Sequence, residues 1–188
     1  MADAKHLRME ELEARLEEIR QSPRDEGVLD LIVRRPRSLE RELLMEAELD
    51  LEVGLVGDNW KTRGSPLTED GLSHPDMQIN IMNSRVIALV AQEKCRWQLA
   101  GDQLFIDMDL SHENLPAETR LAIGSAVIEV TAIPHTGCKK FVERFGLDAM
   151  KFVNSPLGKR LRLRGLNAKV VQGGVIRLGD VVRKVDRI

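Results

Sequence analysis

Short segments in which apolar and polar residues alternate recur along this chain, with glycine-containing turns between them. In residues 47–55 the odd positions are all apolar, and three of the even positions carry carboxylates. In residues 104–110 the even positions are all apolar. A period of two is the signature of a strand with one buried face. Many such strands and few helical patterns predict a mainly β fold, a barrel or a sandwich, decorated with helices.

The second half of the chain predicts strands joined by tight turns. Residues 120–133 indicate two short strands around a turn at 124–125. Residues 160–185 indicate three strands, with turns at 173–174 and 179–180. In the KRLRLR part of this tail, basic residues alternate with leucines. We therefore expect those basic residues on the solvent face of a strand and not in a nucleic-acid-binding patch.

The N-terminal segment, residues 1–22, predicts one amphipathic helix. Leu12, Leu16 and Ile19 recur at spacings of four and three, which places them along one stripe. Glu and Arg cover the other faces, so we expect this helix on the surface. The sequence QSPRDEG breaks the helix. Residues 28–186 then form the single domain that a chain of 188 residues favours.

The composition excludes several classes of function. Aromatic residues make up 3% of the chain and tyrosine is absent, which argues against the stacking platforms of single-strand nucleic-acid binders. The formal net charge of -2 gives no global positive field for DNA or an anionic membrane. No apolar run approaches the roughly 20 residues that span a bilayer, and the charged N-terminus does not resemble a signal peptide. We therefore expect a cytoplasmic protein with reduced cysteines that binds neither nucleic acid nor membrane.

The segment IPHTGCKKFVERFG, residues 133–146, contains Cys138 between a predicted strand and a predicted helix. The partial positive charge of a helix N-terminus and the adjacent Lys139 and Lys140 lower the pKa expected for this thiol. His135 is a candidate base or orienting group for it. The residues alone also allow a buried cysteine that packs as a small hydrophobe.

Two other chemistries fit this segment less well. His135 and Cys138 have the spacing of two zinc ligands, and His74 or His112 would have to supply a third. A cysteine–histidine hydrolase would need an orienting group and an oxyanion hole, neither of which the sequence shows. We rank both below a Cys138 that is reactive or binds another metal.

Three polar segments supply further candidate side chains. GLVGDNWKTRG places Lys61 and Arg63 after two glycines, which suits an anion such as phosphate, although an ordinary solvated turn has the same composition. Asn83 and Arg85 interrupt an apolar run and need partners, either from the backbone or from a ligand. Asn114 lies in SHENLP, where capping or a turn is the simplest explanation.

Four stretches, taken in order, resemble the MOSC domain, which is named after the C-terminal domain of molybdenum cofactor sulfurases. They are ERELLMEAELDLEVGLVGDNW, GDQLFIDMDLSHENLP, RLAIGSAVIEVTAIPHTGCKKFVERFG and RLRGLNAKVVQGGVIRLGDVV. The resemblance covers residues 28–186 and is most specific around Gly137 and Cys138. It implies a distorted β-barrel plus the N-terminal helix, and a pocket that receives the molybdenum cofactor or a sulfur atom bound for it.

For individual residues, the resemblance implies that Cys138 ligates molybdenum or carries a persulfide. A thiolate suits both tasks, because it is a good ligand for a soft metal and a good nucleophile towards sulfur. The family's cofactor also carries a phosphate, which basic and amide-bearing loops would hold. The cofactor-binding candidates are Lys61, Arg63, Asn83, Arg85, Asn114, Thr136 and Gly137, and His135 is a second catalytic candidate beside Cys138.

The resemblance leaves three functions open. The first is a molybdenum-dependent oxidoreductase that reduces N-hydroxylated compounds with electrons from a separate reductase. The second is a sulfur-carrier or cofactor-delivery module, in which Cys138 receives its sulfur from a donor protein. The third is a non-catalytic binding domain. The sequence contains neither a pyridoxal-phosphate-dependent domain nor a ferredoxin-like domain, so we expect a standalone module.

Overall fold

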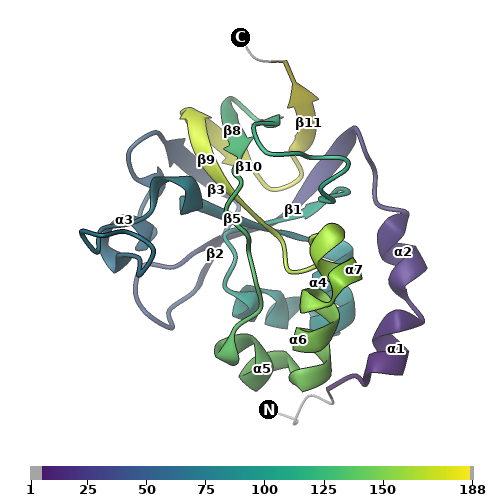
Figure 1. Ribbon diagram of the computed structural model, residues 1–188. Helices are drawn as coiled ribbons and strands as arrows, with labels where there is room; N and C mark the ends of the chain where they lie inside the picture. Colours follow the sequence, from purple (N-terminus) through teal and green to yellow (C-terminus); the bar gives the residue numbers. More distant parts are fainter. Residues whose placement is uncertain (1–5, 187–188) are drawn as a thin grey trace.

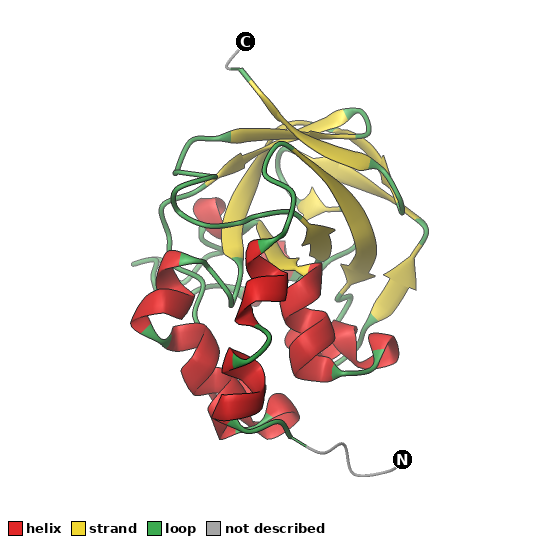
Figure 2. Cartoon of the chain, turned by 90° about the vertical axis from the view of Figure 1, so that its right-hand side faces the viewer, coloured by secondary structure: helices red, strands yellow, loops and turns green. Residues whose placement is uncertain are grey.

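The computed structural model describes residues 6–186. Seven strands pair edge to edge and close into a barrel. The barrel lies at one end of the molecule, and most helices lie at the other (Figure 2). The barrel strands are β1 (Glu26–Arg34), β5 (Ile79–Asn83), β6 (Leu104–Asp107), β7 (Arg120–Ile123), β8 (Ala126–Val130), β9 (Leu166–Gln172) and β11 (Val181–Val185). Their order around the barrel is β1, β11, β7, β8, β9, β5 and β6, and β6 pairs with β1 again. The predicted barrel with added helices is confirmed, and helix and strand contents are about equal.

The first strand closes the barrel because it is long enough to pair with several neighbours. β1 pairs near its start with β11, along its middle with β6, and near its end with the short β2 (Glu42–Leu44). A register shift between Leu29 and Leu31 marks a bulge, which bends the strand. β5 and β6 run parallel, so the chain needs a crossover between them. The helix α4 (Ser84–Ala91) lies in that crossover.

Two apolar cores lie on opposite sides of the barrel wall. One fills the barrel interior, and the other lies between the outer face of the wall and the helices. The strand β5 serves both cores, because Ile81 packs inside the barrel and the adjacent Met82 packs against the helices, and both are fully buried. This double burial explains why the segment around β5 reads as a continuous apolar run.

Most helices form a layer against one side of the barrel, and α3 (Trp60–Arg63) stands apart from them (Figure 1). Besides α3 and α4, the helices are α1 (Met9–Glu13), α2 (Leu16–Arg20), α5 (Lys139–Phe145), α6 (Leu147–Asn154) and α7 (Pro156–Arg160), with 3-10 turns η1 (Pro75–Met77) and η2 (Lys94–Ala100). No helix among residues 6–186 has the length and apolar character that crossing a bilayer requires.

The N-terminal segment differs from the single surface helix that was predicted. It forms two short helices, α1 and α2, and residues 1–5 of the predicted range lie outside the described residues. Leu12 is fully buried and Ile19 is nearly so, and both belong to the core of the helical layer. The predicted apolar stripe therefore packs against the domain and does not lie free on its surface.

The alternating segment 47–55 is a hairpin and not one strand. It divides into β3 (Glu46–Asp50) and β4 (Gly54–Leu55), which pair antiparallel and join β10 (Gly174–Arg177) in a second, three-stranded sheet. The carboxylate of Asp50 accepts hydrogen bonds from the backbone amides of the next turn, at 2.8 and 3.0 Å. Because of this turn Leu51, expected on the buried face, is 56% exposed.

Candidate functional site

Cys138 is one of the residues that line a large pocket. It is a free, exposed cysteine and caps the N-terminus of α5, at the end of the loop that leaves β8. The interpretation of Cys138 as a buried filler of the core is therefore wrong. The pocket has a volume of about 780 Å³. Its lining residues are Trp60, Arg63, Gly64, Ser65, Pro66, His74, Met77, Cys138, Lys139 and Lys140.

The charged side chains that line this pocket, hereafter the Cys138 pocket, are cationic. Arg63, Lys139 and Lys140 contribute positive charge, and no carboxylate lines it. Burial lowers the pKa of Arg63, the nearby Arg35 lowers it further, and only Asp58 opposes these effects. A guanidinium stays charged in a protein even so, and the carboxylate of Asp58 pairs with Arg35 and not with Arg63.

One wall of the Cys138 pocket begins at Trp60, and a buried ion pair holds this wall in place. Arg35 donates to both carboxylate oxygens of Asp58, at 2.8 Å each, and the two side chains are almost completely buried. Asp58 also accepts a hydrogen bond from the backbone amide of Trp60 at 2.9 Å. The GLVGD loop is thus fixed by its aspartate, which turns the chain from β4 into α3.

The same arginine is linked along the outer face of the barrel wall to the loop that carries Cys138, residues 131–138, hereafter the cysteine loop. Arg35 donates to the Asn80 side-chain oxygen at 3.0 Å, and the Asn80 amide donates to Asn167 at 2.6 Å. Asn167 in turn donates to the carbonyl of Ile133 at 3.0 Å, five positions before Cys138. We name the side chains of Asp58, Arg35, Asn80 and Asn167 the polar relay. It joins both walls of the Cys138 pocket.

Two hydrogen bonds to helix α6 fix the backbone next to the thiol. Gly137 donates its amide to the side-chain oxygen of Asn154 at 2.9 Å, and its carbonyl accepts from the Asn154 amide group at 3.2 Å. A β-carbon at Gly137 would lie within 3.4 Å of Asn154, Met150 and Val153. This close approach gives a reason for the glycine that precedes the cysteine.

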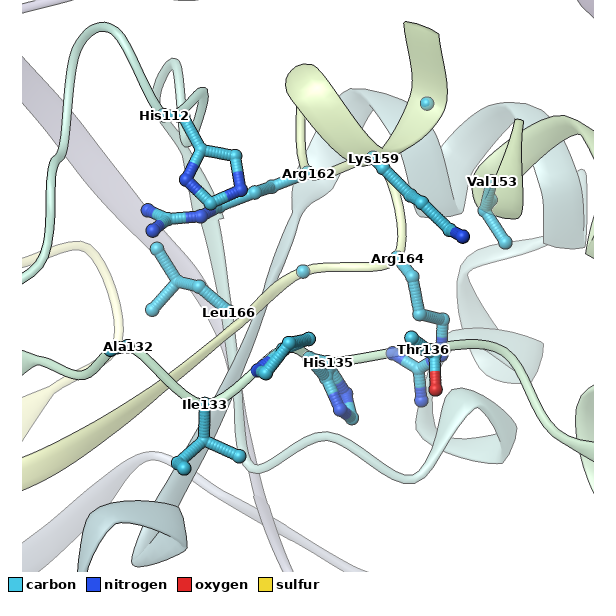
Figure 3. A pocket seen from close by; sticks show the side chains of 13 residues that line it. His112, Ala132, Ile133, His135, Thr136, Val153, Lys159, Arg162, Arg164 and Leu166 are labelled. Carbon is cyan, nitrogen blue, oxygen red and sulfur yellow. The ribbon is translucent and has the colours of Figure 1, made fainter. Parts of the chain in front are cut away.

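A second pocket is lined by the first part of the cysteine loop, residues 132–136 (Figure 3). It has a volume of about 370 Å³, and we call it the His135 pocket. Its lining residues are His112, Ala132, Ile133, Pro134, His135, Thr136, Val153, Gly158, Lys159, Arg162, Arg164, Gly165 and Leu166. His135 and Thr136 thus belong to this pocket, and Cys138 belongs to the other.

His135 is held by a fully buried aspartate. Its Nε2 lies 2.8 Å from Asp102, and its side chain is 15% exposed. Arg164 donates to both oxygens of the same carboxylate, at 3.0 and 2.8 Å. Burial acts to raise the pKa of Asp102, but Arg164 and His135 outweigh it and lower the pKa to about 2. Burial and Arg164 lower the pKa of His135, against the opposing effect of Asp102.

The remaining predicted side chains do not line either pocket. Asn83 caps α4 and donates to Ser22 and to the carbonyl of Met108, at 2.9 and 2.6 Å. Arg85 pairs with Asp107 at 2.7 Å. Asn114 donates to two backbone carbonyls in its own region, at 2.9 and 2.8 Å. Lys61 is exposed beside the ring of Trp60. Of the predicted cofactor-binding set, only Arg63 shares the pocket of Cys138.

The basic tail segment departs most from its predicted position. Arg162 and Arg164 were expected on the solvent face of a strand, but they lie in the turn between α7 and β9 and are almost completely buried. Asp102, in contact with Arg164 and His135, carried no signal in the sequence. Within residues 6–186, no cluster of three or more His, Cys, Asp or Glu residues is arranged to hold a metal ion.

Comparison with known proteins gives the family. A profile of the MOSC domain matches residues 68–183. No curated protein matches the sequence. The YUAD protein from Bacillus subtilis has a similar structure, with a TM-score of 0.63 at 14% identity over 86% of this chain and 97% of that chain. YiiM from Escherichia coli gives 0.54 at 20% identity over 86% and 71%, respectively.

YiiM from Geobacillus stearothermophilus is similar in the same way, with a TM-score of 0.51 at 14% identity over 86% of this chain and 74% of that chain. At these identities the solved structures establish the fold alone. The profile match covers more than half of the 188 residues. The chain belongs to the MOSC domain family.

Proposed function

We propose that this protein binds the molybdenum cofactor in the Cys138 pocket, with the Cys138 thiolate as the protein ligand of molybdenum. The observation that carries the proposal is the exposed thiol in a large pocket whose charged lining is entirely cationic. A thiolate is a suitable ligand for a soft metal centre. A carboxylate-free pocket lets an anionic cofactor enter without repulsion.

The donor set of the pocket fits the other end of the cofactor as well. Its phosphate needs charge-assisted hydrogen bonds, which Arg63 and the two lysines after Cys138 can donate. Arg63 is the best candidate, because it is exposed in the lining and the nearby carboxylate of Asp58 pairs with Arg35 instead.

We infer that the loaded protein acts as an oxidoreductase in the cytoplasm, on N-hydroxylated compounds, with a separate reductase as electron donor. The bound cofactor supplies the two-electron chemistry by which an oxygen atom leaves nitrogen. The chain's own residues hold and orient the cofactor: Cys138 through its sulfur and Arg63 through its guanidinium. The polar relay keeps the two walls of the pocket at a fixed separation.

The second candidate function is sulfur transfer, which the exposure of Cys138 also supports. A thiolate at the surface can attack a persulfide on a donor protein and take over its outer sulfur, and the donor's thiolate leaves. This reaction requires access to a protein partner but no bound metal. The two candidates therefore differ in what the purified protein carries.

The deciding experiment measures bound molybdenum and released pterin on protein purified from a host that makes the cofactor. We expect both in the wild-type protein and a loss of molybdenum in Cys138→Ser. Cys95→Ser is the matched control, because Cys95 is the other exposed free cysteine and lies outside the pocket. Wild-type protein without molybdenum, or equal molybdenum in Cys138→Ser, would contradict the proposal.

A second pair of variants tests the phosphate end. Arg63→Gln should weaken retention of the pterin during gel filtration, whereas Lys61→Gln, on the same helix but outside the lining, should retain it. For sulfur transfer, the readout is the intact mass after incubation with a cysteine desulfurase and cysteine. An added sulfur atom that is absent in Cys138→Ser, on protein that carries no molybdenum, would favour the sulfur carrier.

A further inference from the structure

The His135 pocket contains positive charge that the protein itself does not neutralise. Asp102 is fully buried and pairs with Arg164, so these two charges cancel. Arg162 and Lys159 remain, and neither forms an ion pair with a carboxylate of the described residues. Two unneutralised cations thus line one small cavity.

Arg162 is the more informative of the two because it is almost completely buried, at 7% exposure. Its Nη1 donates to the backbone carbonyl of Leu115 at 2.5 Å and lies 3.5 Å from that of Leu110. Burial alone lowers its pKa, with no nearby anion acting in the opposite direction. A buried arginine without a carboxylate or another anion is rare, because desolvating the charge is costly. The backbone at Arg162 is also unusual, with a φ of 50°.

Two other basic side chains of this pocket, His112 and Arg164, also have polar groups in unfavourable surroundings. His112 lies against Arg162 at one end of the pocket, and Lys159 and Arg164 lie at the other (Figure 3). Burial lowers the pKa of His112, and the charge of Arg162 lowers it further. The Nε of Arg164 is buried and has no hydrogen-bond partner in the described part of the chain. An anion bound beside Arg162 and His112 would offset the cost of burying the guanidinium charge.

The rest of the lining is apolar. Ala132, Ile133 and Pro134 contribute one wall from the cysteine loop, and Val153 and Leu166 contribute from α6 and β9. A cavity of about 370 Å³ falls within the range of small-ligand sites, in which a mostly apolar lining surrounds a few polar groups. The lining therefore suits a ligand with one anionic head and a compact apolar body.

We propose that the His135 pocket is a second ligand site, separate from the Cys138 pocket, that binds small organic anions. The oxyanion head, a carboxylate or a phosphate, lies against Arg162, and the apolar body lies against Ile133 and Leu166. Lys159, at the other end of the pocket, attracts the anion over a longer distance. The site needs no molybdenum cofactor. Its ligand would contact the cysteine loop at Ile133, so that occupancy can be sensed at Cys138 without blocking the thiol.

The test uses full-length protein purified from a host that cannot make the cofactor, so its outcome is independent of the molybdenum measurement. Benzoate, phenyl phosphate, inorganic phosphate and the neutral benzyl alcohol are titrated while methyl resonances are followed by NMR. We expect benzoate or phenyl phosphate to shift the methyls of Ile133, Val153 and Leu166. Inorganic phosphate should bind more weakly because it lacks the apolar body, and benzyl alcohol should not saturate.

Variants separate a built site from general attraction of anions. Arg162→Gln should weaken the dissociation constant by about tenfold or more, since it removes a charge-assisted hydrogen bond in a buried place. Because Arg162 also holds backbone carbonyls, Lys159→Gln provides a second variant at an exposed position, with an expected loss of about threefold. Arg160→Gln removes the same charge from the exposed neighbour outside the lining and should leave binding unchanged.

Three outcomes would overturn the proposal. Equal binding of benzyl alcohol and benzoate would show that the cations do not select the ligand. Equal losses in Arg160→Gln and Lys159→Gln would show attraction to the surface only. Shifts confined to Met77 and to the indole of Trp60 would place the anion in the Cys138 pocket instead.

Discussion

Asp102 is the single side chain on which both His135 and Arg164 depend for their positions. Asp102→Asn keeps the size of the side chain but leaves the buried Arg164 without an anion. Breaking a buried ion pair by removing one partner costs about 3 to 5 kcal/mol. We expect a loss of this order in the free energy of unfolding, measured by urea denaturation.

The control for this change is Asp25→Asn. Asp25 pairs with Lys184 at the surface, and its side chain is 87% exposed, so this variant should unfold almost as the wild type does. A similar loss in both variants would mean that removal of any negative charge destabilises the fold. In that case the buried pair would have no special part in stability.

The lowered pKa of His135 makes stability depend on pH in a defined direction. The unfolded chain binds a proton at this histidine near its ordinary pKa of 6.5, whereas the folded chain does so only at lower pH. Stability is therefore full above pH 6.5 and falls as the pH decreases below it, by at most about 1.4 kcal/mol per pH unit for one histidine. Asp102 stays ionised over this range, because its pKa is about 2.

The measurement is the free energy of unfolding at pH values from 8 down to 5 for the wild type and for His135→Gln. The variant should lose part of the slope, while His112, whose pKa is also lowered by burial, continues to contribute. Parallel curves for the two proteins would mean that His135 titrates in the same way folded and unfolded. His112→Gln provides the matched comparison.

A functional residue can be recognised from the local sequence when its residue type is rare in the chain and its neighbours indicate the same chemistry. Cys138 meets both conditions, and the structure places it in the open at a helix N-terminus as expected. Arg162 and Arg164 meet neither, because alternation with leucine is what a solvent-facing strand also produces. Their burial depends on Asp102 and on the carbonyl of Leu115, which are far away in the sequence.

Among the elements, the N-terminal helices contribute most beyond what their sequence suggests. Leu12 is fully buried in the core between the helices and the barrel wall. Leu12→Ala should lower the free energy of unfolding by about 2 to 5 kcal/mol, as in other buried positions where a cavity is left. Thermal or urea unfolding checks the value.

Leu67→Ala is the control for this element, because Leu67 is an exposed leucine in the loop after α3. Its effect should be within about 0.5 kcal/mol. If Leu12→Ala were equally mild, α1 would not be part of the cooperative domain. The segment before residue 28 would then be a separate appendage, as the sequence alone suggests.

Turn-forming residues predicted the ends of the strands more accurately than the alternation of apolar and polar residues did. The turns at 124–125, 173–174 and 179–180 were predicted because glycines mark them, and strands end and begin at these turns, although β9 starts at Leu166 and not at residue 160 as expected. The turn between β3 and β4 was missed because Asp50, Leu51 and Glu52 continue the alternation into it. The side chain of Asp50 decides the outcome through its bonds to the backbone, which a period of two does not reveal.

At the scale of the whole molecule, the closed barrel is what brings distant candidate residues together. The polar relay runs along its outer face from Asp58 to the cysteine loop, and Asp102 links that loop to the turn before β9 through His135 and Arg164. The sequence predicted a barrel but not which strands pair, because pairing depends on contacts over long sequence separations. The two pockets lined by different parts of the cysteine loop are a consequence of that pairing.

Closure of the barrel depends on β11, which bridges β1 and β7. Val182 is fully buried in the barrel interior, and its neighbour Val181 is 42% exposed on the same strand. Val182→Asp places an unpaired carboxylate in the apolar core, which costs several kcal/mol, whereas Val181→Asp places the same group in water. We expect Val182→Asp to unfold the protein or to shift its unfolding midpoint strongly, with a small shift for Val181→Asp.

If the barrel and the helical layer are one cooperative unit, far-ultraviolet circular dichroism and tryptophan fluorescence will report the same transition. A variant that loses strand signal but keeps the tryptophan signal of the helical layer would show that the two cores fold independently.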